Sequence, residues 1–244
     1  RQKMAIYTSK TRIDLEDVGY SNKITNKAIL KILENAGARQ SETIHFGLND
    51  MENVGFSWIL LGWKVKILKR PIYNEELTIN TWGRDSNRIF TYRDYEIYDE
   101  SGELCAIATS KWAIVDINTG KLRELTPEII EKYQCETKKV FEEDYTLKLK
   151  EPVTIIRKQE YKAQRRDIDI NKHIHNLYYL DYAYEALPEE VYEAPECNNI
   201  EIMYKKQIRL NDEFKCLYTK EENQNIVTMK SEDENTLHAI IKLY

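Results

Sequence analysis

The chain has 244 residues, of which 42% are hydrophobic and 32% are charged, with a formal net charge of −5 at pH 7. This composition is typical of a folded globular protein and excludes a mainly disordered chain. The negative charge disfavours general nucleic-acid binding, which needs a basic surface. No apolar run approaches the roughly 20 residues of a membrane-spanning helix, and no signal peptide is visible.

Cysteine usage points to a reducing compartment. The chain has four cysteines without CxxC spacing: Cys105, Cys135, Cys197 and Cys216. Such scattered cysteines favour free thiols over a disulfide framework or a zinc site. We therefore expect a cytoplasmic protein that uses neither a metal nor another cofactor.

The first half of the chain opens with an expected strand at residues 3–13 and a helix at residues 25–37. Thr25 or Asn26 caps this helix, and Gly37 suits the position just after its last turn. Four β-rich runs follow, at residues 55–69, 76–84, 88–99 and 103–117.

A short helix that opens at Thr126-Pro127 and runs toward Tyr133 completes the first half. The second half repeats the order, with a strand at residues 155–163 and a helix at residues 174–187 that Pro188 ends. Four further strands are expected at residues 199–209, 213–221, 224–232 and 236–244.

The order of strand, helix and four strands therefore occurs twice, which indicates an internal structural repeat. A curved antiparallel sheet wrapped around one long helix would bury the apolar stripe of each helix. This predicts an α+β fold with an N-terminal domain at residues 1–135 and a C-terminal domain at residues 151–244. The acidic and lysine-rich residues 136–150 are the expected linker.

A dense polar motif lies just before the second helix. Asp169, Asn171 and His173 occupy alternate positions, so on extended backbone their side chains would point the same way. Unpaired N–H groups and the dipole at a helix N-terminus favour developing negative charge. Such a site beside an imidazole suits acyl-transfer chemistry. Asp and Asn before a helix are also ordinary N-caps, and spacing alone leaves both interpretations open.

Family resemblance strengthens the first interpretation. The stretch DIDINKHIHNLYYLDY resembles the start of the second hotdog domain of acyl-acyl-carrier-protein thioesterases, with the motif Asp-x-Asn-x-His, an Asn and a helix. The stretches TWGRDSNRIFTYRDYEIYD and SKWAIVDINTGKL resemble that family's first domain. The resemblance covers nearly the whole chain and implies a double hotdog, in which two antiparallel sheets each wrap around a central long helix.

The resemblance implies hydrolysis of fatty acyl-carrier-protein (acyl-ACP) thioesters to free fatty acid and carrier thiol. Asp169, Asn171 and His173 match the family's catalytic Asp, Asn and His. His173 would act as general base or position the water, because its reference pKa lies near working pH. Asp169 would orient or polarise the imidazole. Asn171 would donate to the carbonyl oxygen or hold water, with backbone N–H groups at the helix start completing the oxyanion site.

One segment departs from the family pattern. The family usually has a catalytic Glu in a segment like Tyr-Lys-Arg-Glu, followed by Cys in the plant enzymes, whereas residues 204–208 here read YKKQI. Gln207 thus takes the place of a catalytic residue but has no carboxylate. Since Ile208 supplies no thiol, direct attack by water is favoured over a covalent acyl-enzyme.

Two further sets of residues are candidates for substrate binding. Three tryptophans on first-half strands either line an acyl tunnel in the domain that the resemblance assigns to the acyl chain or fill the core: Trp58, Trp63 and Trp82. A basic cluster around the motif would steer an acidic carrier protein bearing a phosphopantetheine-linked chain: Arg165, Arg166, Lys172, Lys205 and Lys206.

Two other classes of function stay open from the sequence. A hotdog hydratase or dehydratase would favour a Gly-containing helix start, and residues 174–187 contain no glycine. A non-catalytic acyl-ACP or lipid-binding module is favoured by Gln207. Because one chain supplies the pair of hotdogs that single-domain relatives build by dimerising, we expect a monomer or a homodimer.

Overall fold

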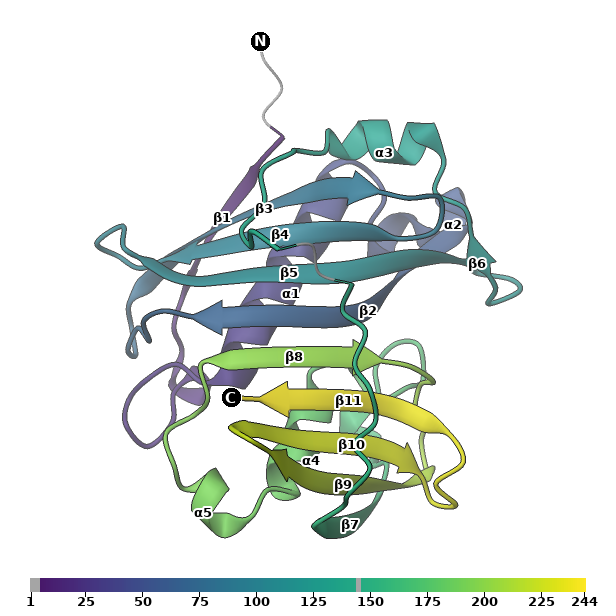
Figure 1. Ribbon diagram of the computed structural model, residues 1–244. Helices are drawn as coiled ribbons and strands as arrows, with labels where there is room; N and C mark the ends of the chain where they lie inside the picture. Colours follow the sequence, from purple (N-terminus) through teal and green to yellow (C-terminus); the bar gives the residue numbers. More distant parts are fainter. Residues whose placement is uncertain (1–4, 144–145) are drawn as a thin grey trace. The chain divides into compact units, whose positions relative to one another are not determined.

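The computed structural model describes residues 5–143 and 146–244, which form two compact units (Figure 1). The first unit comprises Arg1–Leu61 and Val65–Tyr145, and the second comprises Gly62–Lys64 and Thr146–Tyr244. Each unit combines one antiparallel sheet with a main helix, which is the α+β arrangement that the repeat predicted. In the described residues, no helix is long and apolar enough to cross a membrane.

The sheet of the first unit has the strand order β1-β3-β4-β5-β2, and β6 extends it beside β5. The described start of the first strand is Tyr7; residues 3–4 of the expected strand lie outside the described part. The bounds are β1 Tyr7–Arg12, β2 Phe56–Ile67, β3 Glu76–Ser86, β4 Thr91–Tyr98, β5 Leu104–Asp116 and β6 Leu122–Arg123.

Helix α1 (Asn26–Thr43) packs against β1 and β3 and crosses one face of this sheet (Figure 1). Its first turn is capped by Thr25, whose Oγ1 accepts the N–H of Ala28 at 3.1 Å. Ile29 and Leu33 on its inner face are fully buried. Burial of this stripe holds the helix against the sheet.

The expected helix end at Gly37 is wrong, because α1 continues to Thr43. Gly37 lies inside the helix and is buried. A Cβ atom there would lie 3.1 Å from both Arg93 Cδ and the hydroxyl oxygen of Tyr95. The glycine is therefore explained by close packing of sheet side chains on the helix, not by a left-handed cap.

Two short helices complete the first unit, α2 (Met51–Val54) and α3 (Pro127–Tyr133). Of these, α3 is the short helix expected from Thr126-Pro127 toward Tyr133, and it is confirmed. Thr126 Oγ1 accepts the N–H of Ile129 at 3.4 Å, and Pro127 occupies the first turn.

The sheet of the second unit has the strand order β8-β11-β10-β9-β7, with antiparallel pairing throughout. The bounds are β7 Arg157–Lys162, β8 Asn199–Tyr204, β9 Glu213–Glu221, β10 Gln224–Ser231 and β11 Leu237–Leu243. Helix α4 (Tyr178–Glu185) packs against β11, and a short helix α5 (Glu189–Tyr192) follows.

The helix expected at residues 174–187 is wrong at both ends. Helix α4 begins only at Tyr178; the backbone at Ile174, where the helix was expected to start, pairs instead with Ile208 through a 2.8 Å N–H to O bond. The helix ends at Glu185, and Pro188 precedes α5 instead of terminating α4. The polar motif therefore lies in a separate turn that ends at His173, before the first residue of α4.

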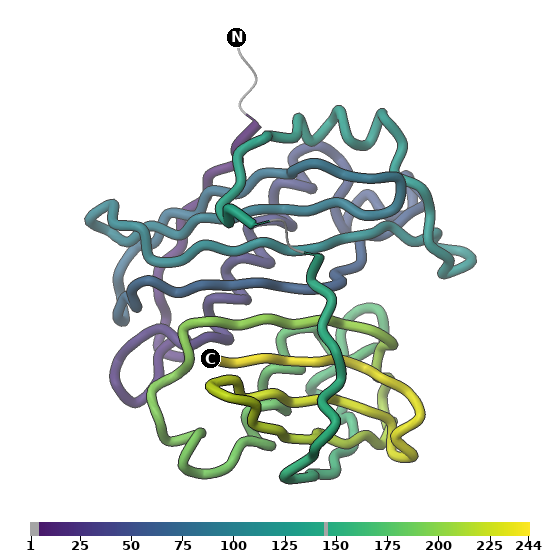
Figure 2. The backbone as a smooth tube through the Cα atoms, in the orientation of Figure 1, coloured from purple at the N-terminus to yellow at the C-terminus, as the bar shows by residue number. Residues whose placement is uncertain are grey.

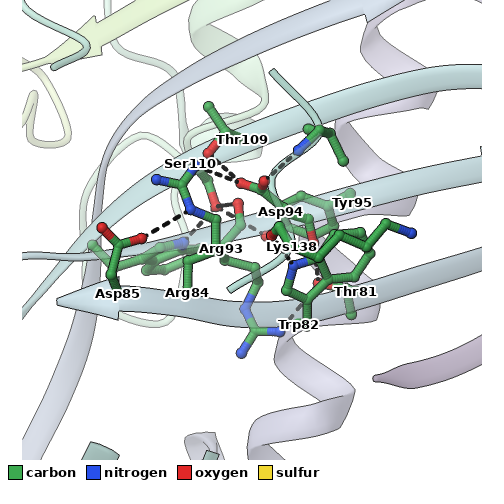
Figure 3. Close-up of polar contacts among 12 residues, drawn as sticks. Thr81, Trp82, Arg84, Asp85, Arg93, Asp94, Tyr95, Thr109, Ser110 and Lys138 are labelled. Carbon is green, nitrogen blue, oxygen red and sulfur yellow. Dashed lines mark hydrogen bonds and ion pairs between the residues drawn. The ribbon is translucent and has the colours of Figure 1, made fainter. Parts of the chain in front are cut away.

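A buried polar network in the first unit was not predicted from the sequence. Asp94 on β4 has no exposed surface and accepts bonds from Arg84 Nη1 at 3.3 Å and Thr109 Oγ1 at 2.6 Å (Figure 3). The backbone N–H of Val140 donates to the same carboxylate at 2.9 Å. Desolvation raises the pKa of Asp94, although these bonds act in the opposite direction.

The network also holds the chain that leaves the first unit. Trp82 Nε1 donates to the carbonyl oxygen of Lys138 at 2.9 Å, and Lys138 Nζ donates to Glu96 at 2.8 Å. These contacts lie within the expected linker at residues 136–150. The first residues of that segment therefore cover the sheet of the first unit.

Replacing Asp94 with Ala is expected to destabilise the protein strongly, because Arg84 would lose its buried partner, and among the described residues the one ion pair left to it would be that of its Nε with the exposed Asp85. The expected loss is on the order of 3–5 kcal/mol in the free energy of unfolding, measured by urea denaturation. Glu124→Ala, which breaks the exposed ion pair with Arg88, is the control and should change stability far less. Equal losses in the two variants would contradict the role of burial.

Candidate active site

The polar motif lies on two tight turns of the second unit that are joined side by side. In the first turn, residues 169–173, the N–H of Asp169 donates to the carbonyl oxygen of His173 at 2.8 Å. In the second turn, residues 209–212, the N–H of Asp212 donates to Arg209 at 3.1 Å. A β-bridge between His173 and Arg209 joins the turns. We call this arrangement the two-turn frame.

The expected extended backbone of the motif is wrong. Lys172 has a φ of 63° and reverses the chain, so Asp169, Asn171 and His173 are not aligned on one strand face. The Asp169 Oδ1 atom accepts the backbone N–H of Asn171 at 2.8 Å and of His173 at 3.3 Å. The carboxylate therefore stabilises the turn that presents the other two residues.

His173 is the titratable group at the centre of the motif. Its side chain is half-buried, and its Nδ1 atom is buried without a hydrogen bond to any residue in the described part of the chain. Burial lowers the pKa of His173, and Arg209 acts in the same direction, while Asp169 opposes it. The imidazole is therefore neutral at neutral pH, which is the form that accepts a proton.

Gln207 is brought to the same frame. The N–H of Ile174 donates to the carbonyl oxygen of Ile208, which follows Gln207 directly. The segment is anchored by the N–H of Lys205, which donates to His238 at 2.8 Å. The Gln207 side chain is exposed. Gln207 thus lies next to the backbone pairing that joins the two turns, and its place in a catalytic site stays a prediction.

The basic residues lie in or near the segments of this frame in the sequence, with Lys172 in its first turn. All five are exposed: Arg165, Arg166, Lys172, Lys205 and Lys206. Arg166 Nε lies 3.7 Å from Asp167 Oδ1, and its side chain is mainly in solvent. These residues form a positive surface beside the motif, and their contact with a carrier protein stays a prediction.

The three tryptophans lie on strands β2 and β3. Trp63 and Trp82 are fully buried, whereas Trp58 is half-buried. The Trp58 ring packs edge-on against Phe56 and Tyr133, with centroid distances of 6.1 and 5.6 Å. All three therefore contribute to packing, and a further contact with an acyl chain stays a prediction.

Two tyrosines that the sequence analysis did not single out hold the frame together. Tyr204 donates its hydroxyl to the carbonyl oxygen of Asn176 at 3.3 Å, and Tyr179 accepts the N–H of Ile208 at 3.3 Å. Their rings pack edge-on with centroids 5.3 Å apart. The tyrosine-rich start of the helix was the available signal, but it looked like ordinary core.

Asp167 is a further residue that holds the frame together. It is buried, its carboxylate accepts the hydroxyl of Tyr182, and its carbonyl oxygen accepts the N–H of His175 at 2.9 Å. The residue thus fixes the chain on both sides of the motif.

The first unit contains the same frame with different side chains. Figure 2 shows the backbone of both units, coloured along the sequence. The N–H of Gly19 donates to Lys23 at 3.0 Å, and Lys23 bridges to Ile72. Asn22 has a φ of 56°, as Lys172 has 63°. Gly19 and Lys23 therefore stand where Asp169 and His173 stand, and only the second frame carries the polar motif.

Comparisons with known proteins define the class. Residues 4–133 match the family model of the acyl-ACP thioesterase N-terminal domain, and residues 150–242 match that of the C-terminal domain. An acyl-ACP thioesterase from Bacteroides thetaiotaomicron has a similar structure, with a TM-score of 0.84, 23% identity and coverage of 98% of this chain and 97% of the other. The 12:0-ACP thioesterase from Umbellularia californica gives a TM-score of 0.86 at 15% identity, covering 100% and 98%.

The fold is therefore the double hotdog that was expected, and the chain belongs to the acyl-ACP thioesterase family. Among curated proteins it is 25% identical to oleoyl-acyl carrier protein thioesterase 2, chloroplastic, of Arabidopsis thaliana over 238 residues, which is 91% of this chain. It is also 25% identical to the Coriandrum sativum oleoyl-acyl carrier protein thioesterase over 244 residues, or 92% of this chain. The chain spans 65% of the length of each.

Asp169→Asn tests whether the carboxylate acts through the turn or through its charge. Asparagine keeps the side-chain oxygen that accepts the two backbone N–H groups, so we expect it to retain much more thioester hydrolysis than Asp169→Ala. Steady-state kinetics of both variants measure this. If Asn and Ala lose activity equally, the turn-capping role is insufficient and the charge is required.

The pH dependence of hydrolysis tests the state of His173. A general base works only when neutral, and burial lowers its pKa, so kcat/KM should fall on acidification with an inflection below the ordinary value of 6.5. In Asp169→Asn the inflection should move lower still, because the carboxylate that raises the pKa is gone. An inflection above 6.5 in the wild type would contradict this.

Proposed function

We propose that this protein hydrolyses fatty acyl-ACP thioesters to free fatty acid and carrier thiol. The observation that carries the proposal is the half-buried imidazole of His173, whose Nδ1 has no partner among the described residues, on a turn capped by Asp169 within the segment that matches the thioesterase C-terminal domain. A positioned base of this kind is what activation of water requires.

In the proposed reaction, His173 takes a proton as water attacks the thioester carbon. The new C–O bond forms while the carbonyl electrons move to oxygen, and the Asn171 amide donates to that oxygen. Collapse of the tetrahedral intermediate breaks the C–S bond. The proton on the imidazole then goes to the leaving thiolate, so that water and thioester yield acid and thiol.

Gln207 fits this direct route. An amide cannot act as a carboxylate base, and Ile208 provides no nucleophilic sulfur, so neither residue supports a covalent intermediate. Gln207 can still donate or accept a hydrogen bond near the attacking water. In this account the base is His173 alone.

The proposed hydrolysis of acyl-ACP also assigns a place for the acyl chain, a surface for the carrier protein and a cellular location. The N-terminal domain, residues 1–135, would hold the acyl chain with Trp58, Trp63 and Trp82 among its contacts. The basic cluster would attract the acidic carrier protein by long-range electrostatics. The protein would act in the cytoplasm as a monomer or homodimer, in fatty acid biosynthesis.

A second candidate is a module that binds acyl-ACP without hydrolysing it. The exposed Gln207, which replaces a carboxylate, is the observation that favours it. Thioesterase, binding module and hydratase differ in product: free fatty acid, no product, or an acyl thioester that has gained or lost water.

Thiol release from carrier protein loaded with acyl chains of several lengths tests the proposal. We expect release by the wild type, and roughly 100-fold or greater loss in His173→Ala and in Asn171→Ala, as for removal of a positioned acid–base or oxyanion group. Both variants should remain folded by circular dichroism.

Gln207→Glu in the same assay separates the two candidates. If the protein is a thioesterase, the wild type already releases thiol, and the Gln207→Glu substitution changes only the rate of release. Release that occurs only in Gln207→Glu would show that the wild type is a binding module. Unchanged release in both His173→Ala and Asn171→Ala would remove the site assignment.

A further inference from the structure

The two frames can be aligned residue by residue from their backbone bonds. The N–H of Ile24 donates to Pro71 at 2.9 Å, just as that of Ile174 donates to Ile208 at 2.8 Å. Asn74 and Asn211 have φ values of 71° and 68° at equivalent places of the second turn. The residue before each acceptor is therefore equivalent as well, so Arg70 corresponds to Gln207.

In the first unit this position closes the frame with a charged group. Arg70 Nη2 donates to Asn26 Oδ1 at 2.7 Å, and its Nη1 donates to the carbonyl oxygen of Ile24 at 2.9 Å. The Asn26 side chain is fully buried. The guanidinium thus satisfies the amide from within the protein.

In the second unit the equivalent side-chain amide, that of Asn176, has no guanidinium from the described part of the chain bound to it. Asn176 corresponds to Asn26, because Asp17 and Asp167 accept the N–H groups of Thr25 and His175, one residue earlier, each at 2.9 Å. Asn176 is half-buried and Gln207 is exposed. Neither side chain forms a hydrogen bond with a residue of the described part.

The backbone of Asn176 is nevertheless held in place. Its carbonyl oxygen accepts the hydroxyl of Tyr204, which is itself packed on Tyr179. An amide on a fixed backbone, half-removed from water and without a protein partner, is suited to a ligand group that completes its bonds.

We propose that Asn176 is a further catalytic residue, whose side-chain amide turns its Nδ2 toward the place that Arg70 occupies in the first unit and donates there to the carbonyl oxygen of the acyl thioester. The proposal rests on the proposed function, since it takes the thioester to bind at this motif. A neutral hydrogen-bond donor suits a carbonyl oxygen that becomes an oxyanion. Asn176 also lies close to His173 in the sequence.

The same comparison explains Gln207. A guanidinium at this position would bind Asn176 internally and exclude the substrate. An uncharged, shorter side chain keeps the frame formed but leaves the amide accessible. Gln207→Arg should therefore close the second frame as Arg70 closes the first.

Asn176→Ala and Asn26→Ala form a matched pair for kinetics and thermal unfolding. Removing one oxyanion donor costs about 100-fold or more in kcat, so we expect a loss of that size in Asn176→Ala with nearly unchanged Tm. Asn26→Ala should lower Tm, because Arg70 loses its buried partner, and should leave kcat near the wild-type value. Unchanged kcat in Asn176→Ala, or a change in KM alone, would overturn the proposal.

A second readout does not depend on turnover. Binding of a fatty acyl-pantetheine analogue with a methylene in place of the sulfur, which keeps the carbonyl oxygen but cannot be hydrolysed, is measured by calorimetry. We expect clearly weaker binding by Asn176→Ala than by the wild type. If the wild type binds the analogue but releases no thiol from acyl-ACP, the hydrolytic function fails and the contact stands. Equal affinity in both proteins would remove the contact whether or not hydrolysis occurs.

Gln207→Arg gives an independent check by a double-mutant cycle. The variant should raise Tm in the presence of Asn176 and lose that gain in the Gln207→Arg, Asn176→Ala double variant. An equal change in Tm with and without Asn176 would contradict the equivalence with Arg70.

Discussion

The backbone bond from Ile174 to Ile208 is the constraint on which the candidate site depends. It draws two segments far apart in sequence into strand-like pairing and keeps Ile174 out of the helix, which starts at Tyr178. The turn before it is then short enough for Asp169 to cap, which sets His173 beside Arg209. The position of the imidazole therefore follows from main-chain hydrogen bonding, and side-chain contacts refine it.

The same constraint occurs twice and has two outcomes. In the first unit the frame is completed by Arg70 on Asn26 and by the ion pair of Lys31 with the buried Asp17. These bonds satisfy buried polar groups and contribute to stability. In the second unit, the equivalent region keeps an imidazole nitrogen and an amide that have no hydrogen-bond partner among residues 5–143 and 146–244. The candidate functional groups are thus polar groups for which the described part of the fold supplies no hydrogen-bond partner.

Much of the fold could be predicted from the sequence, because alternation and turn residues mark strands well. The stretch 76–84, with buried Leu77 and Ile79, is an example, and the Thr126 cap is another. The position of Gly37 was misjudged, since a glycine that admits a sheet side chain looks the same in sequence as one that ends a helix.

The candidate residues could be named from the sequence, but their geometry could not be predicted. The motif singled out Asp169 and His173, yet the reversal at Lys172 and the exclusion of Ile174 from the helix accompany pairing with a segment more than thirty residues further along the chain. Local periodicity contains no information on such pairing. The buried contact of Asp94 with Arg84 was missed for the same reason, because it joins neighbouring strands.

Exchanging the residues between the two frames tests the central claim, that the second frame alone carries the chemistry. Thiol release from acyl-ACP is measured for the wild type, for His173→Lys and for Lys23→His. The account predicts wild-type rates in Lys23→His and loss of nearly all release in His173→Lys, with both variants folded. Release by His173→Lys at the wild-type rate would contradict it.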